Sequence, residues 1–387
     1  MLNINSSDKT KVFKIIFIQL ISASIAFIAP IVINANYGNA KLADILYIYS
    51  GFVLVYSLAN LGLPEQIQVW RSRGGVLLDL GGFFLIACLI IFSISAVLYF
   101  FNIDFSIILL IIFCFSYILF ESLCRILNQD GNIIFGQILL SLFPILFWIN
   151  AYLEIISIDS SLVLFSFILS MCALSFILFK GEFAKGKQQR ESVEISFLGT
   201  SKIYITRSYA ALFAEMPLII LFNASSSANV VIYGIITRII LPISMIVQSF
   251  YSVFLRKKII GHYSLPKVSF RSVIFFIIVF LAFGSFFYEA VNEILFANFT
   301  IPIVSMYLVF AIAAYRVFTT LFILLNSWNI EKIHMIGFRL LFLPIITFTI
   351  IFGCYYFLSI SESIIFLILS AVLMAFIYFF NRIYDSN

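Results

Sequence analysis

The sequence is poor in charged residues, and this shortage narrows the class of protein before any motif is considered. Only 11% of its 387 residues are Asp, Glu, Lys or Arg, whereas soluble proteins average about 25%. Hydrophobic residues make up 63% of the chain. Such a composition is typical of a membrane protein, and we expect an all-α polytopic fold whose hydrophobic helices cross the bilayer.

Signals for catalysis and for metal binding are also missing. The five cysteines all lie inside apolar runs and form no CxxC motif, so neither disulfides nor a metal site is predicted. His262 and His334 lie in or beside polar breaks among Lys and Arg residues, where solvation explains them better than catalysis. The sequence has no P-loop and no polar segment long enough for the extramembrane site of a membrane-embedded transferase. We therefore expect no enzymatic activity, no bound cofactor and no nucleic-acid partner.

Apolar runs of about 18 to 25 residues, separated by polar breaks, predict twelve membrane-spanning helices. The predicted spans lie near residues 13–35, 45–63, 76–101, 105–125, 133–153, 161–179, 203–223, 230–254, 272–291, 301–325, 334–357 and 363–381. Eighteen of the 23 Lys and Arg residues lie at the termini or in breaks after even-numbered spans, while the other breaks contain only Lys41. Because cytoplasmic loops carry an excess of Lys and Arg, both termini are expected to be cytoplasmic.

The longest polar break, from Lys180 to Lys202, follows the sixth predicted span and is rich in charge. We interpret it as a linker. The predicted domains are then an N-terminal six-helix half (1–180), a cytoplasmic linker (181–202) and a C-terminal six-helix half (203–387). Six spans per half means that both halves begin on the same side of the membrane, so the halves are expected to be parallel and to enclose a central cavity.

Charged residues inside predicted spans are the sharpest functional signal. Glu215 and Arg238 belong to neighbouring spans, and a rise of about 1.5 Å per residue places both near the middle of the membrane. An ionisable residue at that depth faces the bundle interior or a watery cavity, because lipid tails cannot solvate it. A structural ion pair is one interpretation of these two residues, and a binding or coupling site is the other.

Other charged residues in spans differ in their depth. Arg316 lies about 21 Å from the outer end of its span by the same rise per residue, and its span contains no acid, which makes it a candidate anion ligand. Arg207 and Arg339 lie within about two turns of cytoplasmic ends, where a long side chain reaches the headgroups. Glu121 and Arg125 are four residues apart near the end of the fourth span and are expected to pair with each other.

The first two spans carry neutral polar side chains in place of charge, among them Asn34 and Asn60. In one interpretation these side chains line a hydrophilic cavity suited to sugar hydroxyl groups, with Tyr47 available for stacking. In the other they serve helix packing, which is the commoner role of small and polar residues in membrane helices. The sequence leaves both interpretations open.

Three stretches of the sequence resemble a known family. Asn36-Tyr37-Gly38, the following Tyr47, and Leu61-Gly62-Leu63-Pro64 ahead of Arg71 are similar to the first hairpin of that family. The stretch from Tyr233 to Arg238 resembles the family's span-eight pattern, and Glu215 stands one helix earlier, where relatives often carry Asp. On these residues the chain resembles the lipid-linked oligosaccharide flippases of O-antigen and capsule synthesis, in the multidrug/oligosaccharidyl-lipid/polysaccharide exporter superfamily.

The resemblance implies twelve spans in two parallel halves and export of a polyprenyl-pyrophosphate-linked glycan repeat unit by alternating access. The implied location is a bacterial cytoplasmic (inner) membrane. Arg238 and Arg316, with Arg207 nearer the surface, would bind the pyrophosphate. Glu215 would hold Arg238 in the empty site or couple transport to proton or sodium movement.

The implied partners are the lipid-linked oligosaccharide, membrane lipids and, as candidate protein partners, a polysaccharide polymerase and a chain-length regulator. Asn34, Asn60 and Tyr47 are the residues expected to face sugar. Two other interpretations remain: a cation-coupled multidrug exporter of the same superfamily, and a membrane-embedded polymerase or transferase.

Overall fold

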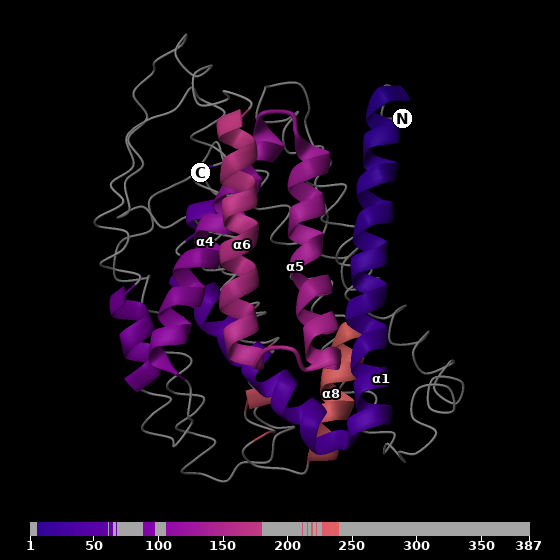
Figure 1. Cartoon of the computed structure of the whole chain (residues 1–387), viewed down its shortest axis with the longest axis vertical. Helices are drawn as coiled ribbons and strands as arrows, with labels where there is room; N and C mark the ends of the chain where they lie inside the picture. The colour runs from indigo at the N-terminus through magenta and orange to yellow at the C-terminus, as the bar shows by residue number, and fades with distance from the viewer. Residues whose placement is uncertain are drawn as a thin grey trace, which may run out of the picture.

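The computed structural model describes residues 6–60, 62–64, 67, 88–96, 106–179, 211, 215, 218–219, 222 and 227–239. Every regular element in this part of the chain is a helix (Figure 1). The labelled helices are α1 (Ser6–Ala59), α4 (Ile107–Gln129), α5 (Ile133–Leu153), α6 (Ile158–Phe179) and α8 (Ser227–Ile239). The first four are long and apolar enough to cross a membrane, which confirms the expected all-α architecture for the described residues.

Helix α1 contains two of the predicted spans. Its apolar part, Phe13–Ala59, has 47 residues, and at about 1.5 Å per residue this is roughly twice the thickness of a bilayer's hydrocarbon core. Gly38 interrupts the helix with φ 82° and ψ 173°, and the chain reverses direction near that point (Figure 1). We call residues 6–37 the first arm and residues 39–59 the second arm. The polar break predicted between the two spans is thus reduced to one non-helical residue.

The first arm lies beside α5 and runs in the same direction. Near the start of both helices, Gln19 Nε2 donates a hydrogen bond to Gln137 Oε1 at 2.6 Å. Near their ends, Tyr37 OH donates to the carbonyl oxygen of Tyr152 at 3.0 Å. Neighbours that run in the same direction cross a membrane from the same side, as the predicted first and fifth spans do.

The second arm lies beside α4, again in the same direction. Phe52 packs edge-on against Phe113 with ring centroids 5.3 Å apart, and one turn later Tyr56 packs edge-on against Tyr117 at 4.6 Å. These helices correspond to the second and fourth predicted spans. The described contacts therefore agree with the alternating order of spans inferred from the sequence.

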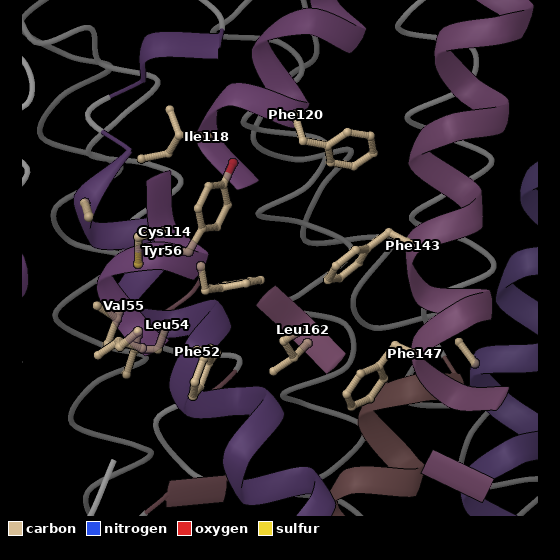
Figure 2. Packing of buried hydrophobic residues seen from close by; sticks show 14 of the residues in the cluster. Phe52, Leu54, Val55, Tyr56, Cys114, Ile118, Phe120, Phe143, Phe147 and Leu162 are labelled. Atoms are coloured by element: carbon tan, nitrogen blue, oxygen red, sulfur yellow. The ribbon is translucent and has the colours of Figure 1, made fainter. Parts of the chain in front are cut away.

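Helix α4 contacts α1, α5 and α6, and the core forms around it. Buried side chains from four helices meet there, as Figure 2 shows. They include Phe52 and Tyr56 of the second arm, Cys114, Ile118 and Phe120 of α4, Phe143 and Phe147 of α5, and Leu162 of α6. Lipid tails are as apolar as these side chains, so in a bilayer the contacts stabilise the bundle through close packing rather than through the hydrophobic effect.

Helix α6 buries several serines beside apolar residues and exposes large apolar side chains. Ser161, Ser166 and Ser170 are buried, while Phe167 is 53% exposed and Leu178 is 60% exposed. In a water-soluble helix the arrangement is the reverse. The exposed apolar face of α6 therefore suits contact with lipid.

The ends of α4, α5 and α6 agree with the predicted spans to within four residues, whereas the two arms of α1 begin seven and six residues before the predicted starts at 13 and 45. Helix α5 has the same first and last residues as the predicted span 133–153. Helix α4 continues to Gln129, four residues beyond the predicted end, because the turn that closes it begins only at Asp130, whose N–H donates to the carbonyl oxygen of Ile126. The side chain of Asn150 closes the turn between α5 and α6 by bonding to both the N–H and the carbonyl of Ile156.

The predicted seventh and eighth spans are described in part. Residues 211, 215, 218–219 and 222 are helical, as is α8 within the predicted span 230–254. Spans nine to twelve and the linker 181–202 lie outside the described residues, so the division into two halves stays a prediction.

Candidate functional site

Helix α8 packs closely against the second arm of α1. The approach is made at Gly234, where an added Cβ would lie 2.5 Å from Leu46 Cδ1. A Cβ at this position would force the Leu46 side chain to move, so the glycine lets Leu46 pack directly against the backbone of α8. The close contact fixes the position of the next turn of α8, which carries Arg238.

Arg238 is buried, with 5% of its surface exposed. Its Nη1 donates a hydrogen bond to the carbonyl oxygen of Gly234 at 2.8 Å. Its Cζ lies 4.9 Å from the ring centroid of Trp148 in α5 and 5.8 Å from that of Tyr49 in the second arm. The guanidinium group thus sits between α8 and two helices of the N-terminal part of the chain.

The rings beside Arg238 belong to a continuous aromatic cluster. Tyr49 lies 4.9 Å from Phe147 and 6.2 Å from Trp148, and the last two lie 5.1 Å apart, all measured between centroids. A desolvated cation over an aromatic face gains about 2 kcal/mol. Insertion of an arginine at the centre of a membrane helix costs about 2.5–3.5 kcal/mol on translocon scales, so the aromatic cluster offsets much of the cost of this charge.

Glu215 lies on the face of its helix that is turned toward the same arm of α1. Residues 211, 215, 218, 219 and 222 follow a helical repeat of three and four positions, which places them on one face. Leu218 and Ile219 are buried in the main core, and Phe222 stacks on Tyr47 with centroids 4.1 Å apart. Glu215 itself is 8% exposed, so this charge, like Arg238, is directed into the bundle.

Comparison with known proteins adds nothing to this site. No family model, no curated protein and no solved structure matches the chain.

The predicted local pair of Glu121 and Arg125 is confirmed. Arg125 Nη2 donates to Glu121 Oε1 at 2.8 Å within α4. Glu121 has a second partner that the sequence did not predict. Tyr56 OH in the second arm donates a hydrogen bond to Glu121 Oε2. No pattern in the sequence indicates that Tyr56 and Glu121, which are 65 residues apart, lie side by side.

The expected sugar-facing residues differ in their surroundings. Tyr47 is 8% exposed and stacked on Phe222, and Asn60 is 1% exposed with its Oδ1 accepting from the N–H of Gly62 at 2.8 Å. Asn60 therefore holds the turn after α1. Asn34 is half-buried, and its Oδ1 is buried without a hydrogen-bond partner among the described residues, so its expected contact with sugar stays a prediction.

Helix packing accounts for two other polar residues of the first arm. Gln19 bonds to Gln137, and Ser22 Oγ donates to the carbonyl oxygen of Ser141 at 3.0 Å. Both polar side chains hold α1 against α5. For these two residues the structure therefore agrees with helix packing rather than with a cavity for sugar. Arg316 and Arg207 lie outside the described residues, and their roles stay predictions.

Proposed function

We propose that this protein is a flippase that carries a polyprenyl-pyrophosphate-linked oligosaccharide across a bacterial cytoplasmic membrane by alternating access. In this proposal twelve spans form two parallel six-helix halves, with both termini in the cytoplasm. The single observation that supports it most is the position of Arg238. Its guanidinium group is buried at the contact of α8, which belongs to the predicted C-terminal half, with helices of the predicted N-terminal half.

Arginine at this place suits a diphosphate cargo for a chemical reason. The planar guanidinium fork binds phosphate oxygens through two parallel hydrogen bonds, and such charge-assisted bonds are about twice as strong as neutral ones. A cation held between two halves is also reached by a cargo from either side when the halves rock. Glu215, directed into the same bundle, would hold Arg238 in the empty protein or couple cargo release to proton or sodium movement. Arg316 and Arg207 would complete the diphosphate site.

The proposal is tested by transport of a fluorescent polyprenyl-diphosphate sugar in proteoliposomes, with a membrane-impermeant quencher reporting the leaflet. Arg238→Met should slow transport by at least about tenfold, since a hydrogen bond to a charged group contributes roughly 1.5–3 kcal/mol. Arg238→Lys should fall between this variant and the wild type, because it keeps the charge and loses the fork. Arg190→Met, in the predicted linker, is the matched control and should transport normally.

Glycan export in cells gives a second test. Strains with Arg238→Ala or Arg316→Ala, at normal protein levels, should export less glycan than the wild type. Undiminished export in both strains would remove the anion-binding role. Export of a cationic dye that is unaffected by Arg238→Met would instead favour the multidrug exporter.

A further inference from the structure

A second buried charge lies in α4, toward the end of the bundle where α4 turns into α5. Glu121 is 5% exposed. Its two carboxylate oxygens are used by different helices: Tyr56 of the second arm donates to Oε2, and Arg125 of α4 donates to Oε1. Glu121 therefore connects the second arm of α1 to α4, and this connection depends on the negative charge that both donors share.

Buried polar atoms continue along the same face of α4 beyond Glu121. Asn128 and Gln129 follow Glu121 by seven and eight residues, about two turns along the helix. Asn128 is 2% exposed, and within the described residues its Oδ1 and Nδ2 and the Oε1 of Gln129 have no hydrogen-bond partner. Polar atoms buried in this way are ordinarily satisfied by water, so this face of α4 suits a short line of water molecules.

The end of this polar line lies at the surface of the bundle. Asn128 and Gln129 form the last turn of α4, and Asp130 begins the turn to α5. Helix α5 covers Asn128 from the side, since an added Cβ at Gly136 would lie 2.6 Å from Asn128 Oδ1. Among the described residues, the α4–α5 turn is the surface that this row of polar atoms reaches.

We propose that Glu121 is a proton-binding site, reached through water from the α4–α5 turn past Gln129 and Asn128, and that its protonation loosens the second arm of α1 from α4. A hydronium ion transfers its proton to the carboxylate and leaves a water molecule behind. The carboxylic acid formed has no net charge, so the ion pair with Arg125 and the charge-assisted bond from Tyr56 are both weakened. The site is independent of which cargo the protein carries.

Among the described residues, the ionisable groups that face Glu121 come from two helices. The second arm contributes Tyr56, and α4 contributes Arg125 and Cys124. Helix α5 contains no charged residue, and α6 contains only Asp159, which lies in its first turn at the other end of the bundle. Among the described residues, Glu121 is thus the carboxylate that joins the second arm to α4, beside the aromatic contacts Phe52–Phe113 and Tyr56–Tyr117.

Two measurements on the full-length protein in nanodiscs test the proposal. The first is infrared difference spectroscopy during acidification, in which the wild type should gain a carboxylic-acid band that Glu121→Gln lacks and Asp159→Asn keeps. The second is maleimide labelling of Cys124, which is fully buried beside Glu121, in a protein whose other four cysteines are replaced by Ser. Glu121→Gln, which mimics the protonated form, should be labelled at least about tenfold faster at neutral pH, because a hydrogen bond to a charged group is lost.

Tyr56→Phe supports the test if Glu121→Gln folds poorly, since it keeps the ring and the carboxylate and removes only the hydroxyl group. It should also increase labelling of Cys124 while keeping the infrared band. The proposal is overturned if the band is the same in wild type and Glu121→Gln. Equal labelling of Cys124 in the wild type, Glu121→Gln and Tyr56→Phe, or an equal increase in Asp159→Asn, would overturn it as well.

Discussion

At the scale of single residues, the two best-described buried charges are stabilised in different ways. Arg238 lies against the faces of Trp148 and Tyr49, whereas Glu121 is held by donors from two helices. An ion pair that is broken on one side leaves an uncompensated buried charge. Loss of Arg125 would leave Glu121 as such a charge, whereas Arg238 contacts two aromatic rings and the carbonyl oxygen of Gly234, which are all uncharged.

The contact of Arg238 with Trp148 predicts a measurable coupling. A double-mutant cycle with Arg238→Met and Trp148→Leu should give an interaction free energy of about 1–2 kcal/mol, since the cation–π contact is desolvated. The measurement is the free energy of unfolding in SDS titrations. Trp148→Phe keeps an aromatic face and should retain most of the coupling, and a coupling near zero in the first cycle would mean that the ring does not stabilise the guanidinium.

At the scale of helices, two of the four described residues with positive φ, Gly38 and Glu154, lie at turns of the chain and differ in backbone conformation. Gly38 has φ 82° and ψ 173°, a region that is accessible essentially only to glycine. Glu154, the C-cap of α5, has φ 53° and ψ 33°, a left-handed helical conformation that asparagine and glycine adopt easily. Adding a side chain at Gly38 and removing the side chain at Glu154 should therefore have opposite effects on stability.

Replacement of Gly38 should destabilise the reversal of α1. Gly38→Ala and Gly38→Asn should each lower the free energy of unfolding by about 1–3 kcal/mol. Nothing lies within 4 Å of an added Cβ at this position, so the cost comes from the backbone and not from a clash. Asn36→Ala, at an exposed helical position, is the control and should be close to neutral; tolerance of alanine at Gly38 would contradict the assigned conformation.

Replacement of Glu154 should instead relieve strain. Glu154→Gly is expected to stabilise the protein by up to about 1 kcal/mol relative to Glu154→Gln, which keeps the strained backbone and loses the same charge. Both variants lose the ion pair between Lys41 and Glu154. The side chains of this pair are 42% and 43% exposed, and a pair this exposed contributes about 0–1 kcal/mol. Thermal unfolding of the two variants provides the comparison, and a less stable glycine variant would be the contrary result.

At the scale of the whole molecule, the described helices place particular residues at opposite ends of the bundle. The start of α1 lies near the start of α5, where Ile15 packs with Ile133. The reversal at Gly38 lies with the end of α5, where Tyr37 bonds to Tyr152. The charge distribution in the sequence predicts that the first of these ends is cytoplasmic.

This orientation is testable by cysteine labelling in intact cells, in a protein without its native cysteines. A membrane-impermeant maleimide should label Asn36→Cys and Ile155→Cys, both at exposed positions. Asp130→Cys, in the turn between α4 and α5, should be labelled only after the membrane is permeabilised. The reverse pattern would invert the topology and the side from which protons reach Glu121.

Run lengths and charge counts were enough to predict the helical class, the positions of the described spans and the local pair of Glu121 with Arg125. These properties belong to one helix in a bilayer, where an apolar segment must match the membrane thickness and neighbours four residues apart must meet. Three features could not be predicted in this way. They are the contact of Arg238 with the Trp148 ring, the hydrogen bond from Tyr56 to Glu121, and the turn at the single non-helical residue Gly38. They depend on how each helix is rotated and how closely two helices approach, as at Gly234 against Leu46, and such contacts arise only when separate helices pack in three dimensions.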